Sequence, residues 1–300
     1  MTETISVCLC TYKRPQLLET LSSLQEQKLP PGVAMEISVA DNDAAGSGKA
    51  VVDAFRRSTA FRVHYEIQPE KNICCARNTT VKNARGDWLA FIDDDEIAEP
   101  NWLASLLQCA RHHEADVVLG AVHIDYPPQT PKWILDGDFF RKYTPPTGTE
   151  MSVGSTCNAL VSRKVLPHPD TPFDPRFGIT GGGDTEFFNR MHRRGARIVS
   201  CREALVSETV EENRLNKDYL MRKATRIGET YAVIFFSALP LPARVWHCSR
   251  AAVQAGVAGA LALVCGPLSN KRSFRYLMKM RSNWGKVRFF FNTPPVQIYK

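Results

Sequence analysis

The amino-acid sequence predicts a mixed α/β fold with a mainly parallel sheet, followed by a helical, basic C-terminal region. Three observations predict this fold. Strand-like and helix-like segments alternate over the first 125 residues. Polar clusters stand where several of these strands end. After Glu211 the pattern is helical to the end of the chain and acidic residues become scarce. We therefore expect two domains, residues 1–212 and residues 213–300.

The predicted strands are short apolar runs bounded by polar or turn residues, as buried parallel strands are. They cover residues 5–10, 36–40, 61–67, 88–92, 117–122, 157–161 and 196–201. The predicted helices begin at Pro15, Lys49, Ile73 and Pro100, and a further one follows the glycines 181–183 and Asp184. Proline is tolerated in the first turn of a helix, where its missing N–H costs nothing. The proline-rich segment 125–149 interrupts the alternation, and we expect it to form a functional loop.

Composition and charge set the class of protein. The chain has 300 residues, of which 44% are hydrophobic, and this excludes a disordered chain. The formal net charge is +7, but residues 211–300 hold 15 Lys and Arg against 4 Asp and Glu. Such an imbalance indicates a basic tail at an anionic surface. Nine cysteines, an odd number without a C-x-x-C pair, are typical of a reduced compartment, and no signal peptide opens the sequence. We expect the body of the protein in the cytosol.

Three polar clusters follow predicted strands, at residues 11–14, 41–43 and 93–95. In an open α/β sheet, ligands bind beyond the carboxyl ends of the strands, so these clusters indicate one binding edge. The alternative is that Asp and Asn simply end strands and cap helices. That explanation suits Asn42 and one of its neighbours better than it suits three consecutive carboxylates.

The acidic triplet Asp93-Asp94-Asp95 is the strongest chemical signal. Adjacent carboxylates repel one another unless a cation neutralises them. Oxygen ligands favour Mg²⁺ or Mn²⁺, which also bind substrate phosphates. We expect a divalent cation that bridges the protein and a diphosphate. The alternative is an acidic loop that caps the helix at Pro100, although Glu96 or Glu99 could provide such a cap.

Other residues add weaker signals. Arg77 could bind a phosphate or order the acidic loop, or be a surface arginine paired with an acid. The ring of Tyr12 lies where a base could stack. The glycines 181–183 allow close approach of backbone to a ligand, and Asp184 follows where it could cap the next helix or act on a ligand.

These motifs in this order resemble family 2 glycosyltransferases with the GT-A fold. The resemblance rests on "SVCLCTYKRP", "ADND", "EKNICCARNTTVKNARGDWLAFIDDDE" and "GGGDTEFFNRM", and it covers about residues 4–210. Within the family, the chain is similar to bacterial exopolysaccharide enzymes of the succinoglycan type. These add single sugars to a lipid-linked oligosaccharide. The resemblance implies an inverting, non-processive transfer from a nucleotide-diphosphate sugar, usually a UDP-sugar.

The resemblance also implies roles for residues of the nucleotide site. Thr11, Tyr12 and Arg14 would line the nucleoside pocket. Asp41 would bind the base through a hydrogen bond. Arg77 would order the nucleotide.

Metal binding and catalysis fall to carboxylates under the same resemblance. Asp93 and Asp94 would face the nucleotide, and Asp93 and Asp95 would face Mn²⁺ or Mg²⁺. Asp184 would be the catalytic base that takes the proton of the acceptor hydroxyl. The family often has a histidine after the last strand as a further metal or phosphate contact. Ser207-Glu208 stands near that place, and whether Glu208 replaces it is open.

The tail combines apolar runs with basic residues. Residues 231–241 and 251–265 are apolar but shorter than the ~20 residues that span a bilayer. An apolar stripe at helical spacing follows, surrounded by seven Lys and Arg between residues 271 and 288: Leu277, Met280, Trp284, Val287 and Phe291. This pattern predicts binding to an anionic membrane, at the cytoplasmic face of the inner membrane. The alternative is helices that pack against the catalytic domain or in a dimer.

Two other functions compete with a membrane-associated glycosyltransferase. A nucleic-acid-binding protein could use the basic tail, although the long apolar runs argue against it and we expect no nucleic-acid partner. A nucleotidyltransferase would normally carry a glycine-rich loop after the first strand, and residues 11–15 contain no glycine. We therefore expect a nucleotide-sugar donor and a lipid-linked saccharide acceptor as partners.

Overall fold

The computed structural model describes residues 2–291 and 293–296. These residues form two compact units. Unit 1 holds residues 2–125, 141–178 and 183–209, and unit 2 holds residues 126–140 and 179–182 and the described residues from 210 onwards. The chain leaves unit 1 after Asp125 and returns at Arg141, so part of the proline-rich segment belongs to unit 2.

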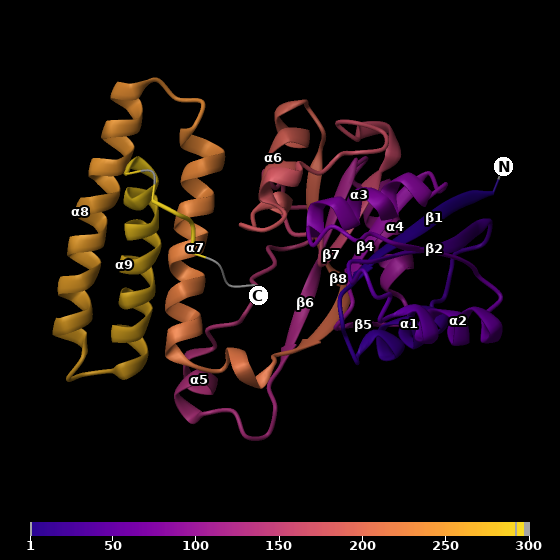
Figure 1. Ribbon diagram of the computed structural model, residues 1–300, viewed down its shortest axis with the longest axis horizontal. Coiled ribbons are helices and arrows are strands. Elements are labelled where there is room, and N and C mark those ends of the chain that lie inside the picture. The colour runs from indigo at the N-terminus through magenta and orange to yellow at the C-terminus, as the bar shows by residue number, and fades with distance from the viewer. Residues whose placement is uncertain (1, 292, 297–300) are drawn as a thin grey trace. The chain divides into compact units, whose positions relative to one another are not determined.

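Unit 1 contains a mixed sheet of eight strands among the described residues, in the order β3-β2-β1-β4-β7-β6-β8-β5 (Figure 1). The strands are β1 Glu3–Thr11, β2 Val33–Asp41, β3 Arg62–Ile67, β4 Trp88–Asp93, β5 Glu96–Ala98, β6 Val117–Asp125, β7 Asn158–Ser162 and β8 Ile198–Thr209. The predicted parallel core is confirmed, because β3, β2, β1 and β4 all run parallel. Strand β7 is antiparallel to both of its neighbours, and β5 is antiparallel to β8.

The predicted helices of unit 1 are also present: α1 Leu17–Gln25, α2 Lys49–Ser58, α3 Ile73–Asn83, α4 Trp102–His112 and α6 Gly183–Arg193. Two details correct the sequence analysis. The last strand continues to Thr209 instead of ending near Cys201. Asp184 lies inside the first turn of α6, not before it, so it is not the N-terminal cap of that helix.

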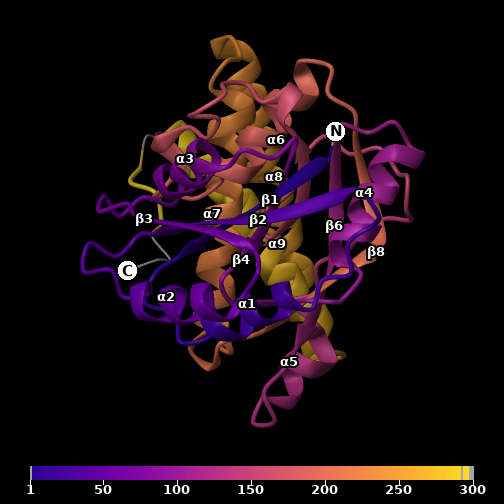
Figure 2. The same cartoon turned by 90° about the vertical axis from the view of Figure 1, so that its right-hand side faces the viewer.

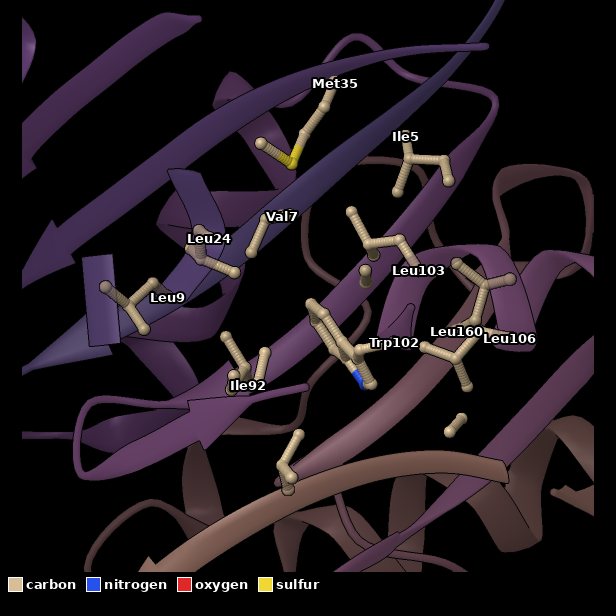
Figure 3. Packing of buried hydrophobic residues seen from close by; sticks show 14 of the residues in the cluster. Ile5, Val7, Leu9, Leu24, Met35, Ile92, Trp102, Leu103, Leu106 and Leu160 are labelled. Atoms are coloured by element: carbon tan, nitrogen blue, oxygen red, sulfur yellow. The ribbon is translucent and has the colours of Figure 1, made fainter. Parts of the chain in front are cut away.

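A large apolar core lies between the sheet and helices α1, α2 and α4. Alternate residues of β1 point into it, which is the period-2 pattern of a strand between two helical layers. Figure 3 shows Ile5, Val7 and Leu9 of β1 near Leu24 of α1 and the ring of Trp102. The indole N–H of Trp102 donates to Asn158 Oδ1 at 2.8 Å, so its burial leaves no polar atom unpaired.

The opposite side of the sheet carries α3 and α6. Phe91 of β4 packs edge-on against Phe173 and Phe187, with ring centroids 5.7 and 6.5 Å apart. Ser38 of β2 donates to the carbonyl of Thr80 in α3. The view in Figure 2 shows α3 and α1 at different faces of the strands. Helices therefore cover both faces of the sheet, and the edge at the carboxyl ends of the parallel strands is left for a binding site.

Unit 2 is helical: α5 Lys132–Gly137, α7 Lys217–Phe236, α8 Leu241–Cys265 and α9 Asn270–Phe290. Helices α7, α8 and α9 lie side by side (Figure 1). Gly228 of α7 and Gly285 of α9 mark a close crossing, because a Cβ on either would meet the backbone of the other helix below 2.2 Å. Arg288 of α9 donates to the buried carboxylate of Glu229 at 2.5 Å.

The structure corrects the prediction for the two apolar runs. Residues 231–241 are divided between the end of α7 and the start of α8. Residues 251–265 are the second part of α8, which has 25 residues and a mean hydropathy of 1.5 over its most apolar window. Among the described helices, α8 alone is long and apolar enough to cross a membrane, a criterion that some core helices of soluble proteins also meet.

Candidate active site

The three predicted polar clusters meet at one edge of the sheet. Strands β2, β1 and β4 are neighbours, and in their register Thr11 lies opposite Asp41 and Cys10 lies opposite Asp93. Parallel strands end at the same edge, so the loops after them share one surface. The predicted convergence of these clusters is therefore confirmed.

Asp41 is completely buried and organises the loop after β2. Its Oδ1 accepts the N–H of Asp43 at 3.0 Å. Its Oδ2 accepts the N–H of Gly48 at 2.7 Å and the hydroxyl of Tyr65 at 2.8 Å. A carboxylate has about four acceptor positions, so these three bonds leave one unused, but Asp41 has no exposed surface. The contact with a nucleobase stays a prediction.

The acidic triplet is held by the loop after β1. Asp94 accepts the N–H of Tyr12 at 3.3 Å. Arg14 lies 3.4 Å from Asp94 Oδ1 through its Nε and 3.3 Å from Asp95 Oδ2 through its Nη2. Burial raises the pKa of Asp94 to about 7, and the carboxylates of Asp95 and Asp93 add to the rise against Thr11 and Arg14. The repulsion from Asp95 and Asp93 is thus the smaller contribution to the rise, and a bound cation would offset it.

Asp93 ends β4 and is the most accessible carboxylate of the triplet. Its side chain is 45% exposed, against 11% for Asp94 and 12% for Asp95. The nearest cation is Arg77, whose Nη2 lies 3.9 Å from Asp93 Oδ1. Asp93 is therefore the triplet carboxylate that a ligand can reach most easily.

Arg77 connects the triplet to the predicted base. Its Nη1 donates to Asp184 Oδ1 at 2.6 Å. Burial alone would lower the pKa of Arg77, but Asp184 and Asp93 outweigh it and raise the pKa. Asn72 caps α3 by accepting the N–H groups of Cys74 and Cys75, which fixes the helix that carries Arg77.

Asp184 is oriented by three donors. Besides Arg77, the hydroxyl of Ser155 donates to Asp184 Oδ2 at 3.2 Å and the N–H of Thr156 does so at 3.3 Å. Gly183 permits this position, because a Cβ there would lie 2.6 Å from Cys74 Sγ in α3. The first turn of α6 therefore packs directly on α3, and Arg77 can reach Asp184.

A second charged cluster was missed by the sequence analysis. Glu96 lies opposite Glu208 in the β5–β8 pairing, so their side chains share one face of the sheet. Lys142 lies between them, 2.5 Å from Glu208 Oε2 and 3.8 Å from Glu96 Oε1. Glu96 Oε2 accepts the N–H of Asp93 at 3.0 Å, which ties the cluster to the triplet. No local pattern around Lys142 indicates this role.

The carboxylate-only donor set suits Mg²⁺ or Mn²⁺. Within residues 2–291 and 293–296, no three His, Cys, Asp or Glu side chains stand arranged as metal ligands. The ion pairs explain this, because Asp94 and Asp95 face Arg14 while Asp93 faces Arg77. Burial is the main cause of the raised pKa of Asp94, and the charges of Asp95 and Asp93 add to it, so a cation beside the triplet would meet three adjacent carboxylates.

Comparison with known proteins identifies the family. The family model for glycosyl transferase family 2 matches residues 6–168, more than half of the chain. This chain belongs to glycosyl transferase family 2. Its membership decides among the three functions considered above in favour of a glycosyltransferase. The matched region of this glycosyltransferase contains the three polar clusters and Arg77, and Asp184 lies beyond it.

Relatives agree with this assignment. The chain is 36% identical to the succinoglycan biosynthesis protein ExoM of Rhizobium meliloti, over 98% of this chain and 95% of ExoM. It is 31% identical to validoxylamine A glucosyltransferase of Streptomyces hygroscopicus, over 69% of this chain and 52% of that protein.

Solved structures show the same fold. A mannosyltransferase of Pyrobaculum calidifontis, in complex with GDP-Man and Mn²⁺, is similar with a TM-score of 0.66 and 16% identity over 97% of this chain and 88% of that one. S. aureus TarS residues 1–349, in complex with UDP, gives a TM-score of 0.54 and 16% identity over 96% of this chain and 91% of that one. The predicted GT-A fold is confirmed.

Proposed function

We propose that this glycosyltransferase moves one sugar, with inversion, from a UDP-sugar to a lipid-linked oligosaccharide in bacterial exopolysaccharide or cell-surface glycan synthesis. The observation that carries the proposal is the bridge made by Arg77, which lies between the exposed Asp93 and the oriented Asp184. The carboxylate that would face the sugar donor, Asp93, and the carboxylate that would act as the base, Asp184, thus lie on either side of the Arg77 guanidinium.

The loop after β1 and its neighbours suit a nucleoside diphosphate. The ammonium group of Lys71 lies 4.9 Å from the centre of the Tyr12 ring, and that of Lys13 lies 5.4 Å from it. An aromatic surface offers stacking to a base, and the adjacent cations attract a diphosphate. Thr11 and Arg14 lie in the same segment of the chain as Tyr12, and Asp41 would have to become accessible to bind the base.

Asp93 and Asp95 would hold a divalent cation, with Asp94 on the nucleotide side. When bound, Mn²⁺ or Mg²⁺ offsets the negative charge that gathers on a leaving diphosphate. Glu208 is neutralised by Lys142 at 2.5 Å, so we do not place it among the metal ligands. Arg14 would have to give up part of its hold on Asp95 when a cation arrives.

Asp184 would take the proton from the attacking hydroxyl of the acceptor. The contact of its Oδ1 with Arg77 is short, at 2.6 Å, whereas its Oδ2 accepts two longer bonds. Oδ2 is therefore the oxygen that an acceptor hydroxyl can compete for. One in-line displacement then inverts the anomeric carbon, and no protein nucleophile is required.

The names of the relatives support the choice of substrates. ExoM is named for succinoglycan biosynthesis, and it matches nearly the whole chain. TarS has been solved with UDP and with UDP-GlcNAc. We place the protein at the cytoplasmic face of the inner membrane, held there by residues 213–300, because a lipid-linked acceptor would be presented at that surface.

The test is a panel of UDP- and GDP-sugars, each with Mn²⁺ or Mg²⁺, assayed for hydrolysis and transfer by the full chain. Asp184→Asn keeps the size of the side chain but removes proton acceptance, and we expect the rate to fall ~10²–10⁴-fold. The Michaelis constant for the donor should change little. Asp170→Asn, at an exposed carboxylate outside the site, is the matched control. Normal turnover by Asp184→Asn would show that another group is the base.

A further inference from the structure

Helix α8 distributes its apolar side chains in an unusual way. Its buried residues are all small: Cys248, Ala251, Ala255, Ala258 and Ala262. Its large apolar residues face outwards instead. A helix of a water-soluble bundle normally turns its large apolar side chains inwards and its small or polar ones outwards. The pattern of α8 is the reverse.

Four large side chains define the outer face of α8: Trp246, Val253, Val257 and Val264. They recur at intervals of seven and four residues, so they share one side of the helix. Trp246, Val253 and Val264 are each 67% exposed and Val257 is 55% exposed. Leu261, also exposed, follows one turn after Val257, and the exposed Leu268 lies just after the end of α8.

The charged residues around α8 indicate which partner its outer apolar face contacts. After Glu229 the sequence holds ten Lys and Arg and no Asp or Glu. Arg250 and Lys271 bracket a stretch of twenty residues without a charged side chain. An apolar face flanked only by cations complements the acyl chains and headgroups of an anionic lipid surface.

The packing of α9 decides how α8 meets the bilayer. Helix α9 runs back along α8 over most of its length. Cys248 Sγ lies 3.7 Å from the carbonyl of Lys286, and the hydroxyl of Ser273 donates to the carbonyl of Ala262 at 2.8 Å. Between these contacts, Met280 and Arg281 line a shallow groove with Gly256 and Gly259 of α8.

This arrangement is incompatible with α8 crossing a bilayer alone. A crossing would place the middle of α9, with Lys279 and Arg281, at the depth of the middle of α8. Charged side chains at the centre of a bilayer are costly. If α8 lies along the surface instead, its outer face meets the acyl chains and the cations of α9 stay at headgroup level.

We propose that α8 lies in the plane of an anionic bilayer surface, with its outer face in the acyl region, and that it does not span the membrane. The proposal refines the membrane placement given above and rests on it. It also moves the lipid contact away from the stripe predicted on α9. In that stripe Val287 is buried within unit 2 and Leu277 and Met280 are half-buried, which leaves Trp284 and Phe291 as its exposed members.

The first test is flotation of the full chain with neutral vesicles of phosphatidylcholine and with vesicles that also contain phosphatidylglycerol. We expect binding to the anionic vesicles. Val257→Asp should weaken it by about tenfold or more, since it puts a charge into the apolar contact. Asn213→Asp adds the same charge at an exposed position before α7 and should change it less than about twofold. Equal effects of the two variants, or equal binding to both vesicles, would overturn the proposal.

The second test measures depth. Val257→Trp in a Trp246→Phe background places an indole at the middle of α8, and lipids brominated near the headgroup or near the bilayer centre quench it according to depth. We expect quenching by the shallow bromines, comparable with that of Trp246 in the natural chain. Stronger quenching by the deep bromines would show that α8 spans the membrane.

A second copy of this chain is the competing occupant. Light scattering of the lipid-free protein distinguishes it, because a dimer that Val257→Asp dissociates, without vesicle binding by the natural chain, would overturn the proposal. Donor hydrolysis in solution is measured alongside and separates the two claims. A natural chain that floats but neither hydrolyses nor transfers any donor sugar refutes the proposed function and leaves the lipid contact standing.

Discussion

Lys142 should stabilise unit 1 chiefly by neutralising Glu96. The carboxylate of Glu96 is fully buried, and burial, opposed in part by Lys142, raises its pKa well above the ordinary value. Lys142→Met removes the cation 3.8 Å away and leaves Glu96 facing Glu208 without a positive partner. Breaking a fully buried ion pair costs ~3–5 kcal/mol. Because Lys142 is 37% exposed and Glu96 can take up a proton, we expect about 1–3 kcal/mol here.

Differential scanning calorimetry measures this loss. At ~2–4 °C per kcal/mol, the melting temperature of unit 1 should fall by about 2–12 °C. The stability that Lys142→Met loses relative to the natural protein should depend on pH. Without Lys142 the folded state keeps a proton on Glu96 that the unfolded state has released, so stability falls as pH rises above the ordinary pKa of a glutamate. The variant should therefore lose more at pH 8 than at pH 5.

A double variant makes the prediction specific. Glu96→Gln keeps an oxygen that can accept the N–H of Asp93 but removes the charge. Combined with Lys142→Met it should recover most of the lost stability, because removing both partners of a buried pair leaves no uncompensated charge. Lys164→Met, at an exposed lysine, is the control. Additive losses in the double variant, or a deficit independent of pH, would refute the reasoning.

Three further outcomes are expected. Transfer should need a divalent cation, so EDTA or Asp95→Ala should abolish it while circular dichroism stays unchanged; full activity in EDTA would contradict the metal assignment. Asp94→Asn should flatten the pH dependence of thermal stability between pH 4 and 7, since the raised pKa of Asp94 makes the folded state lose stability as pH rises through that window. Arg77→Lys should lower kcat more than the donor Michaelis constant, because a lysine lacks the two separate nitrogens that contact Asp93 and Asp184, and an unchanged kcat would rule out the bridge.

Local patterns were enough to predict most of the sheet and its binding edge. The central strands β1, β2 and β4 are largely apolar, whereas β3 mixes polar and apolar residues, and the residues that end β1, β2 and β4 are polar in the sequence itself. Because parallel strands end at one edge, the meeting of Thr11, Asp41 and Asp93 followed from topology. The proximity of Arg77 and Asp184 did not, since it depends on how α6 packs on α3 across 107 residues of sequence.

The missed features are pairings between distant segments. Strand β5 has three residues and follows three aspartates, so by itself it looks like part of an acidic loop. Its strand character comes from pairing with β8, more than 100 residues later. Lys142 stands in a proline-rich segment whose local pattern fixes no structure. In α8, alanine and valine are both apolar, so hydropathy alone could not tell which face would be buried.

Arg77 of α3 lies between two carboxylates, those of Asp93 and Asp184, and this position suits an arginine. Asp93 belongs to the end of the sheet and Asp184 to the first turn of α6, and both are acceptors only while ionised. Two carboxylates directed at one small space repel each other, and a planar guanidinium between them can donate to one and form an ion pair with the other. The two nitrogens of Arg77 lie 3.9 Å from Asp93 and 2.6 Å from Asp184, so the contact with Asp184, the proposed base, is the shorter one. In the proposed function, a donor diphosphate near Asp93 would contact the nitrogen of Arg77 that faces Asp93, while the other nitrogen would keep Asp184 oriented towards the acceptor.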